Sequence, residues 1–369
     1  MISRRQFVVN SALTLGAWAS SGASFGSQQL SEDLDWYNVE DWGIEGKGWT
    51  DTFRYYDRFP KHAKQTVREA VWNLSRHSAG MMTRFRTDAK EVHVRYTLHS
   101  ERLAMAHMPA TGVSGMDLYA EDVTGHSRWV GVSRPVLEET EYKLVDDLSG
   151  LSYLFSIYLP LYNGVESLEI GVPKDTVFAP IQPRTAKPVV FYGTSILHGA
   201  CASRPGMAFT NILGRRLKVP TMNLGFSGNG RMEPEVASLL AELDARTFVI
   251  DCLPNLGPDQ VQERAEPFVK ILRAKHSSTP ILLVEDRSNT NALFKPSRFK
   301  HHQDNRKALR ETYERLQDQD IPNIYYLSGE NLLGTDGEGA TDGSHPNDLG
   351  MMRYADAYEP ALRNILQIY

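Results

Sequence analysis

The second half of the sequence constrains the fold most strongly, because short apolar runs alternate there with longer segments of helical character. The runs are rich in β-branched and aromatic residues, as buried strands are. They predict strands at 189–193, 221–225, 248–253, 281–286 and 324–327. The intervening segments predict helices at 207–217, 234–243, 258–275, 301–319 and 348–368. Five strands, each followed by a helix, indicate an α/β fold with a parallel sheet and right-handed crossovers.

The first half has a different pattern, in which apolar and polar residues alternate. Residues 91–98 place Val92, Val94, Tyr96 and Leu98 on one face of a strand. Further strands are predicted at 81–87, 154–161 and 167–172, and residues 63–74 could form a short helix instead. Several short, half-buried strands indicate an all-β sandwich.

Residues 173–188 contain four prolines and read as a stiff linker between the two patterns. A chain of 369 residues also exceeds the usual size of one domain. We therefore predict a sandwich domain at 30–180 and an α/β domain at 186–369.

The N-terminus carries Ser3-Arg4-Arg5-Gln6-Phe7, which resembles the twin-arginine export signal, and a mildly apolar stretch follows. That stretch is too short and too weakly apolar for a stable membrane span. Residues 1–27 are therefore expected to be a signal peptide that sends a bacterial protein to the periplasm or outside the cell.

Composition excludes several classes of function. The net charge is −5, with 40 basic and 45 acidic residues well mixed, so no basic stripe indicates a nucleic-acid partner. The sequence has no glycine loop of the phosphate-binding type and no metal-ligand cluster, so no cofactor or metal is expected. The two cysteines, Cys201 and Cys252, are expected to be buried free thiols, although a disulfide between them stays open.

Two distant segments supply the groups that nucleophilic catalysis needs. Ser195 follows the strand predicted at 189–193, and the carboxyl ends of parallel strands are where open α/β sheets place their chemistry. Near the other end of the chain, Asp342 and His345 lie three residues apart. A hydroxyl nucleophile needs a base, and the base needs an orienting group.

Four short blocks resemble those of the SGNH (GDSL-type) hydrolases, in the same order. They are Gly193-Thr194-Ser195-Ile196, Gly225-Phe226-Ser227-Gly228-Asn229, Leu253-Pro254-Asn255 and Asp342-Gly343-Ser344-His345. The resemblance covers about residues 186–369 and implies a flavodoxin-like, doubly wound five-stranded sheet.

The resemblance also implies a role for each matching residue. Ser195 would attack an ester carbonyl, His345 would be its base and Asp342 would orient the imidazole. The oxyanion would be bound by the backbone N–H groups of Ser195 and Gly228 and by the side-chain amide of Asn255.

The sequence departs from the family pattern at several positions. Thr194 and Ile196 stand where the family usually has Asp and Leu, and Leu253 and Pro254 replace the usual opening of the Asn255 block. These changes leave the backbone course near Asn255 open. They do not alter the hydroxyl, the imidazole or the amide.

Other residues near the blocks carry weaker hypotheses. Gly225 is a rival to Gly228 as the backbone donor. His198 could face the pocket, but a surface or packing role is favoured. The pair Glu285-Asp286 could border the site, although a solvated strand end is the simpler interpretation.

Gly115-Met116-Asp117-Leu118-Tyr119 resembles the GxDLY signature of a domain that precedes such hydrolases. A structural role is favoured, with Asp117 closing a turn and Leu118 and Tyr119 packed.

Together these observations predict an exported serine esterase that acts through an acyl-enzyme. The expected substrates are small-molecule or polysaccharide esters with short acyl groups, carbohydrate acetyl esters among them. A lipid or thioester acylhydrolase would use the same groups. A non-catalytic glycan-binding protein on the same fold is the alternative from another class.

Overall fold

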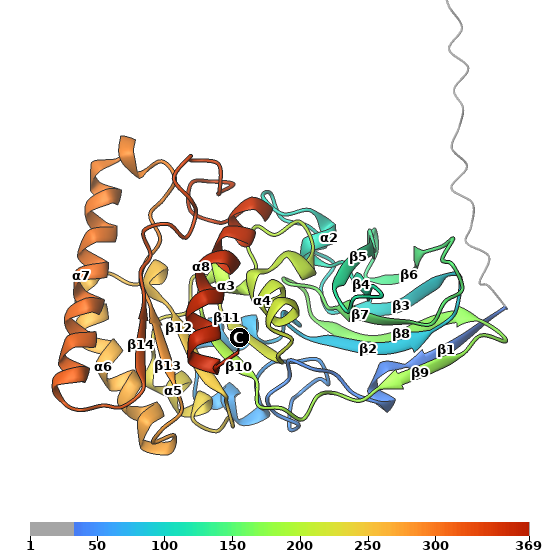
Figure 1. Cartoon of the computed structure of the whole chain (residues 1–369), viewed down its shortest axis with the longest axis horizontal. Helices are drawn as coiled ribbons and strands as arrows, with labels where there is room; N and C mark the ends of the chain where they lie inside the picture. The colour runs from blue at the N-terminus through green and yellow to red at the C-terminus, as the bar shows by residue number, and fades with distance from the viewer. Residues whose placement is uncertain (1–32, 369) are drawn as a thin grey trace, which may run out of the picture. The chain divides into compact units, whose positions relative to one another are not determined.

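A five-stranded parallel sheet forms the centre of the second half of the chain (Figure 1). Its strands, in spatial order, are β11 (Thr221–Gly225), β10 (Val189–Gly193), β12 (Thr247–Asp251), β13 (Ile281–Val284) and β14 (Ile324–Leu327). The first crossover leads from β10 to one neighbour, and the later ones extend the sheet on the other side. This order is doubly wound and flavodoxin-like, so the predicted fold class is confirmed.

Helices cover both faces of this sheet, because its strands are apolar on both sides. Val189 and Phe191 of β10 pack with α3 (Ser195–His198), α4 (Phe209–Leu217) and α8 (Asp348–Leu366). Val190 and Tyr192 pack with α5 (Pro234–Leu240), α6 (Pro258–Lys275) and α7 (Pro296–Asp318). Burial on both faces explains the continuous apolar runs of the sequence.

Two antiparallel sheets make up the first half, and the predicted all-β sandwich is confirmed. One consists, in order, of β1 (Leu34–Asn38), β8 (Val165–Pro173), β3 (Val92–Leu98) and β6 (Glu139–Val145). The other consists of β5 (Ser127–Val132), β4 (Asp117–Glu121), β7 (Tyr153–Tyr158), β2 (Met82–Thr87) and β9 (Phe178–Ile181). Alternate residues of β3 are buried in the shared core, as the pattern predicts.

The stiff linker predicted at 173–188 is wrong in part, because β9 lies inside it. This strand pairs with β2 at the edge of the five-stranded sheet, where Pro180 stands opposite Phe85. An edge strand tolerates proline, because it needs no backbone donor on its outer side. Proline content therefore indicated a linker where the chain in fact completes a sheet.

The segment that could be a short helix, 63–74, contributes two helical turns. They are a 3-10 turn at Lys61–Gln65 and α1 (Glu69–Ser75). Val71 and Trp72 of α1 join the same hydrophobic cluster as α5 and α6, so this early segment completes one face of the parallel sheet. The boundaries proposed for two domains stay a prediction.

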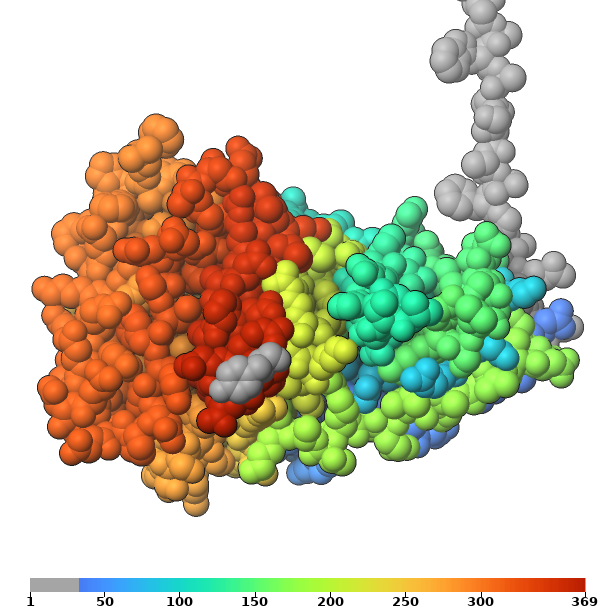
Figure 2. All heavy atoms as spheres, in the orientation of Figure 1, coloured from blue at the N-terminus to red at the C-terminus, as the bar shows by residue number. Residues whose placement is uncertain are grey.

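The structure is a computed structural model that describes residues 33–368, and the predicted signal peptide at 1–27 lies outside them. From Leu34 onward, the described residues form one compact unit. In the space-filling view, the green sandwich surface is in contact with the yellow surface of residues around 200–220 (Figure 2). Within the described part of the chain, no helix has the length and apolar character needed to cross a membrane.

Candidate active site

Ser195 is the first residue of α3, directly after the carboxyl end of β10. Thr194 precedes it as the N-cap residue, and its hydroxyl accepts a hydrogen bond from the Ile196 N–H at 3.4 Å. This explains why threonine can replace the usual aspartate, since both residue types cap helices. Ser195 itself is 7% exposed, so its hydroxyl lies in a recess.

The loop before α8 brings His345 to Ser195 across 150 residues of sequence. The Ser195 hydroxyl lies 2.8 Å from His345 Nε2, and His345 Nδ1 lies 2.7 Å from Asp342 Oδ2. Because the carboxylate can only accept at Nδ1–H, Nε2 is left as the acceptor for the hydroxyl proton. The three predicted residues therefore form one chain of hydrogen bonds.

Asp342 also stabilises the loop in which it lies. Its Oδ1 accepts hydrogen bonds from the backbone N–H groups of Ser344 at 2.9 Å and His345 at 2.8 Å. Partial burial raises the pKa of Asp342, but the hydrogen bonds from His345 and Ser344 outweigh it and lower the pKa to about 2. The carboxyl is therefore ionised throughout the neutral range.

Gly225 and Gly228 have different environments. The Gly225 N–H donates to Asn223 Oδ1 at 2.9 Å, and a Cβ at Gly225 would lie 2.2 Å from the backbone nitrogen of His198. Gly225 is therefore a close-packing position whose donor is already engaged. Gly228 has φ +71° and no atom within 4 Å of an added Cβ, so its backbone faces open space.

Asn255 ends a 3-10 turn, Leu253–Asn255, that follows β12. Pro254 suits the start of such a turn because proline presets φ, and this fixes the backbone course that the sequence left open. Asn255 Oδ1 accepts a hydrogen bond from the Gly230 N–H at 3.2 Å, so the two side-chain N–H groups remain as donors.

Sequence reasoning missed Arg58, a fully buried cation that comes from the first half of the chain. Its guanidinium donates to the carbonyls of Asn223 at 3.0 Å and Gly225 at 2.8 Å, and also to those of Leu74 and His77. Burial lowers the pKa of Arg58 to about 9, so the group is still charged at neutral pH. Nothing in the sequence around Arg58 indicates that it would be buried and would bond these carbonyls.

His198 has the packing role that was favoured. Its ring stacks on Tyr162 with centroids 4.1 Å apart, and its Nε2 lies 3.4 Å from Nδ1 of His77. Burial holds the pKa of His198 well below its usual range, so the ring is neutral. Tyr162, also missed from the sequence, donates to the Ser195 carbonyl at 3.3 Å.

The interpretation of Glu285-Asp286 as a solvated strand end is wrong, because both side chains are buried at the end of β13. Asp286 pairs with Arg287, which donates in turn to the hydroxyl of Ser344. Asp286 also lies 2.7 Å from His302 Nδ1. Asp286 is therefore connected through Arg287 to the loop of Asp342 and His345, whereas Glu285 bonds Arg310, Tyr326 and Gly329.

A hollow of about 520 Å³ lies beside Ser227 and Asn229. The first half of the chain supplies the rest of the lining, which includes His77, Arg102 and Tyr162. Both halves of the chain thus border the space next to the predicted oxyanion donors.

The GxDLY residues fasten the sandwich to the loop that follows α3. Asp117 does not close a turn, as was expected, but begins β4, where Arg204 donates to it at 3.0 Å and the Gly206 N–H at 2.7 Å. Leu118 and Tyr119 are buried, as the structural interpretation requires.

Cys201 and Cys252 are both buried and unpaired. Among residues 33–368, no group of three or more histidine, cysteine, aspartate or glutamate side chains is placed to hold a metal ion.

Two family models match the chain, one for each half. Residues 186–363 match the GDSL-like lipase/acylhydrolase family, and residues 34–178 match the N-terminal region of SGNH-hydrolase-type esterases. No curated protein matches the sequence.

Solved structures resemble the chain over almost its whole length. A protein from Bacteroides ovatus ATCC 8483, described as a GDSL-like lipase, is 34% identical with a TM-score of 0.87, covering 91% of this chain and 99% of that one. The salicylyl-acyltransferase SsfX3 from a tetracycline biosynthetic pathway is 20% identical with a TM-score of 0.71, covering 91% and 99%. A family two carbohydrate esterase from Cellvibrio japonicus is 11% identical with a TM-score of 0.59, covering 90% and 98%. At these identities, the last two show the fold alone.

Proposed function

The chain belongs to the GDSL-like lipase/acylhydrolase family, and from this premise we propose that it is a serine esterase that hydrolyses short-chain acyl esters through an acyl-enzyme. The observation that carries the proposal is the chain of hydrogen bonds from Ser195 through His345 to Asp342, at 2.8 and 2.7 Å. Geometry of this kind is what activates a hydroxyl as a nucleophile.

The reaction follows from the placement of these groups. Ser195 Oγ bonds to the ester carbonyl carbon while its proton moves to His345 Nε2, and Asp342 stabilises the imidazolium. The tetrahedral intermediate expels the alcohol, which takes the proton from His345. Water then attacks the acyl-enzyme with His345 as base, and release of the carboxylic acid restores Ser195.

The charge that develops on the carbonyl oxygen needs donors that are in place beforehand. We assign this role to the backbone N–H groups of Ser195 and Gly228 and to the Asn255 amide. Open space at Gly228 and the orientation of Asn255 by Gly230 support the assignment. Gly225 is the less suitable backbone donor, because its N–H already donates to Asn223 Oδ1.

The proposed substrates are small-molecule or polysaccharide esters, with acetyl esters of carbohydrates as the first to test. Support comes from the hollow beside Ser227, whose lining combines the polar Arg102 and Ser100 with apolar side chains such as Met105. An acetyl group needs little apolar room, and a sugar needs polar partners.

A lipid or thioester acylhydrolase is the second candidate, and an apolar surface near the site favours it. Leu293 and Phe294 are 84% and 82% exposed, beside a second hollow of about 460 Å³. Their segment contacts the catalytic loop, because the Thr290 N–H donates to the Gly343 carbonyl at 2.9 Å. A series of aryl esters from acetate to decanoate separates the two: preference for acetate supports the first, and preference for the long chain supports the second.

Hydrolysis of an aryl acetate by the purified protein tests the central assignment. We expect Ser195→Ala to lose about 10⁴-fold or more in turnover. Ser238→Ala is the matched control, because Ser238 is exposed on α5 and its hydroxyl donates to the Pro234 carbonyl of the same helix at 2.9 Å. Undiminished activity in Ser195→Ala would refute the proposal, whereas a native protein without any esterase activity would favour the non-catalytic glycan-binding protein.

We further propose export through the twin-arginine route to the periplasm or the cell exterior. Support comes from Ser3-Arg4-Arg5-Gln6-Phe7 in the sequence. Fractionation of bacterial cells expressing the native chain and an R4K/R5K variant tests this: the variant should stay inside the cell. Equal export of both would contradict the proposal.

A further inference from the structure

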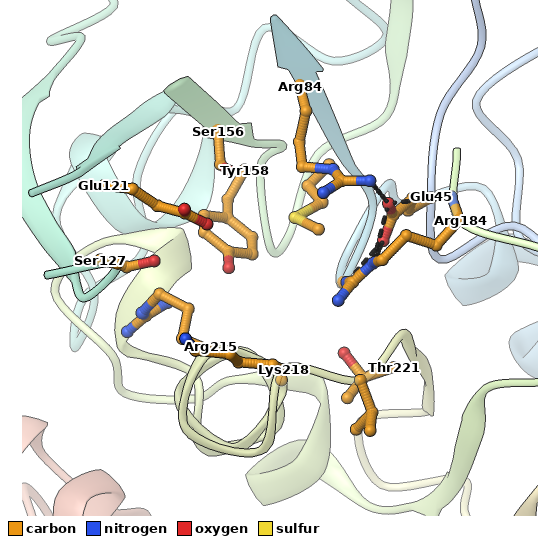
Figure 3. Close-up of a pocket in the computed structure, with 15 residues that line it drawn as sticks. Glu45, Arg84, Glu121, Ser127, Ser156, Tyr158, Arg184, Arg215, Lys218 and Thr221 are labelled. Carbon is orange, nitrogen blue, oxygen red and sulfur yellow. Dashed lines mark hydrogen bonds and ion pairs between the residues drawn. The ribbon is translucent and has the colours of Figure 1, made fainter. Parts of the chain in front are cut away.

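A third cavity lies away from Ser195, where β2, β4 and β7 of the sandwich face α4 and the start of β11 (Figure 3). Thr221, the first residue of β11, lines this cavity, whereas the catalytic turn follows Gly225 at the other end of the strand. Four residue steps separate these positions by roughly 13 Å along the strand. The volume of about 170 Å³ is below that of most drug-sized ligand pockets.

The lining of this cavity carries a surplus of positive charge. Its cations are Arg84, Arg184, Arg215 and Lys218, and its acids are Glu45 and Glu121. Buried Glu45 pairs with both Arg84 at 2.8 Å and Arg184 at 2.7 Å, so that this group of three keeps one net positive charge. With Glu121 set against the two remaining cations, the cavity has a net charge of about +2, by the ordinary charges of these side chains at neutral pH.

Arg215 and Lys218 lack an acidic partner. Within residues 33–368, neither forms an ion pair, and Arg215 Nη1 is buried without a hydrogen-bond acceptor. The Arg215 guanidinium packs over the rings of Tyr119 at 4.1 Å and Tyr158 at 5.3 Å, while Nη2 donates to the Gly206 carbonyl at 2.7 Å. A buried cation without an acidic partner is costly, and an anion in the adjoining cavity would offset the charge of Arg215.

The cations stand on opposite sides of the opening. In Figure 3, Arg84 and Arg184 lie on one side and Arg215 and Lys218 on the other, with the Tyr158 hydroxyl between them. The hydroxyls of Ser127, Ser156 and Thr221 also belong to the lining. Such a set offers donors from several directions, as a tetrahedral oxyanion requires.

We propose that this cavity binds one dianionic oxyanion, a phosphate or sulfate group, free or as the end of a small ester. Two net positive charges match a dianion, and the volume suits a group of this size rather than an oligosaccharide. The sandwich and the parallel-sheet region both contribute to the site, so the bound anion holds the two halves of the chain together. The proposal does not depend on the esterase assignment, because it involves none of the catalytic residues.

The test measures thermal unfolding of the full chain in inorganic phosphate and in chloride at matched pH and ionic strength. We expect the melting temperature to rise with phosphate and to saturate, because a ligand that binds only the folded state stabilises it by mass action. The general salting effect of phosphate does not saturate at low concentration, which separates the two. Calorimetric titration of phosphate, sulfate and glucose 6-phosphate, with glucose as the neutral control, then shows whether the free anion or the ester binds better.

Two variants should shift the affinity for phosphate in opposite directions. Lys218→Ala removes a charge and should weaken binding about tenfold, the scale of one partly exposed charge-assisted contact. Glu121→Gln removes the acid that has no ion-pair partner among residues 33–368, and it should tighten binding several-fold. Lys64→Ala, at an exposed lysine outside the cavity, is the matched control and should change nothing.

Saturable phosphate binding with this pair of opposite shifts supports the site. The proposal is overturned if phosphate gives no saturable stabilisation. It is also overturned if Lys218→Ala lowers the melting temperature equally in both salts, because Lys218 would then serve only the carboxyl end of α4.

Discussion

Asp342 divides its carboxylate between two tasks, since one oxygen receives His345 Nδ1 and the other receives two backbone N–H groups. Only an ionised acid can accept at every one of these positions. The lowered pKa of about 2 keeps it ionised at any pH at which the enzyme is expected to work. An acid limb in the pH–rate profile should therefore not arise from Asp342.

Asp342→Asn tests whether the hydrogen bond between Asp342 and His345 Nδ1 is needed for turnover. The amide can present N–H where the imidazole needs an acceptor, which favours the wrong tautomer, so turnover should fall about 10³–10⁴-fold. The measurement is kcat for aryl acetate, with Asp336→Asn as the matched control on an exposed acid paired with Arg353. A kcat for Asp342→Asn within threefold of the native value would remove Asp342 from the mechanism.

At the scale of elements, the end of β11 depends on a side chain from outside the parallel sheet. Arg58 bonds the carbonyls of Asn223 and Gly225, and the loop that follows contains Gly228. We expect Arg58→Met to lose about a hundredfold in kcat with a smaller change in KM, because displacement of about 1 Å in a positioned group can cost that much.

The control for Arg58 is Arg128→Met, which changes an exposed arginine that pairs with Asp122. If Arg58→Met does not fold, Arg58→Lys keeps the charge but loses the fork of donors, and kcat should still fall. Native kcat in a folded Arg58→Met protein would show that the turn holds its own shape.

The strands of the parallel sheet were largely predictable from the sequence. β10, β11 and β14 have the predicted bounds, because each is a short apolar run closed by a turn residue. β1, β4, β5, β6 and β9 were not predicted. In β5 and β6 most side chains are partly or fully exposed, so no clean alternation marks them.

The candidate site was predictable only in the three residues of the proposed triad. Ser195 was indicated by its position after a strand, and Asp342 and His345 by their residue types and their spacing of three before the last helix. Arg58 and Tyr162 donate hydrogen bonds to backbone carbonyls. Every residue has such a carbonyl, so the sequence cannot indicate which ones these side chains bond. The charges of Glu285 and Asp286 suggested solvent, whereas tertiary pairing with Arg310 and Arg287 allows their burial.

At the scale of the whole molecule, stability should depend on pH through Asp251, which is fully buried at the end of β12. Burial raises its pKa from 3.8 to about 7, against the opposing hydrogen bond that Tyr358 donates at 2.7 Å. A pKa raised on folding means that the folded chain holds the proton more tightly. This contribution is therefore complete below about pH 4 and is lost as the pH rises towards 7.

Asp251→Asn removes that dependence while keeping an acceptor for Tyr358. Relative to the native protein, the variant should gain free energy of unfolding between pH 5 and pH 8, as measured by denaturant titration at both values. The comparison must be made against the native chain at each pH, because buried His77 and His198, with lowered pKa values, contribute with the opposite sign. A difference between variant and native that does not change with pH would show that Asp251 does not titrate on folding.

The account as a whole rests on the nucleophilicity of one hydroxyl, and covalent labelling measures it most directly. A fluorophosphonate probe should add one adduct per native chain, located by peptide mass spectrometry on Ser195. Labelling should be absent in Ser195→Ala and strongly slowed in His345→Ala, while Ser238→Ala should label as the native protein does. An unlabelled native chain, or an adduct on another residue that persists in Ser195→Ala, would contradict the account.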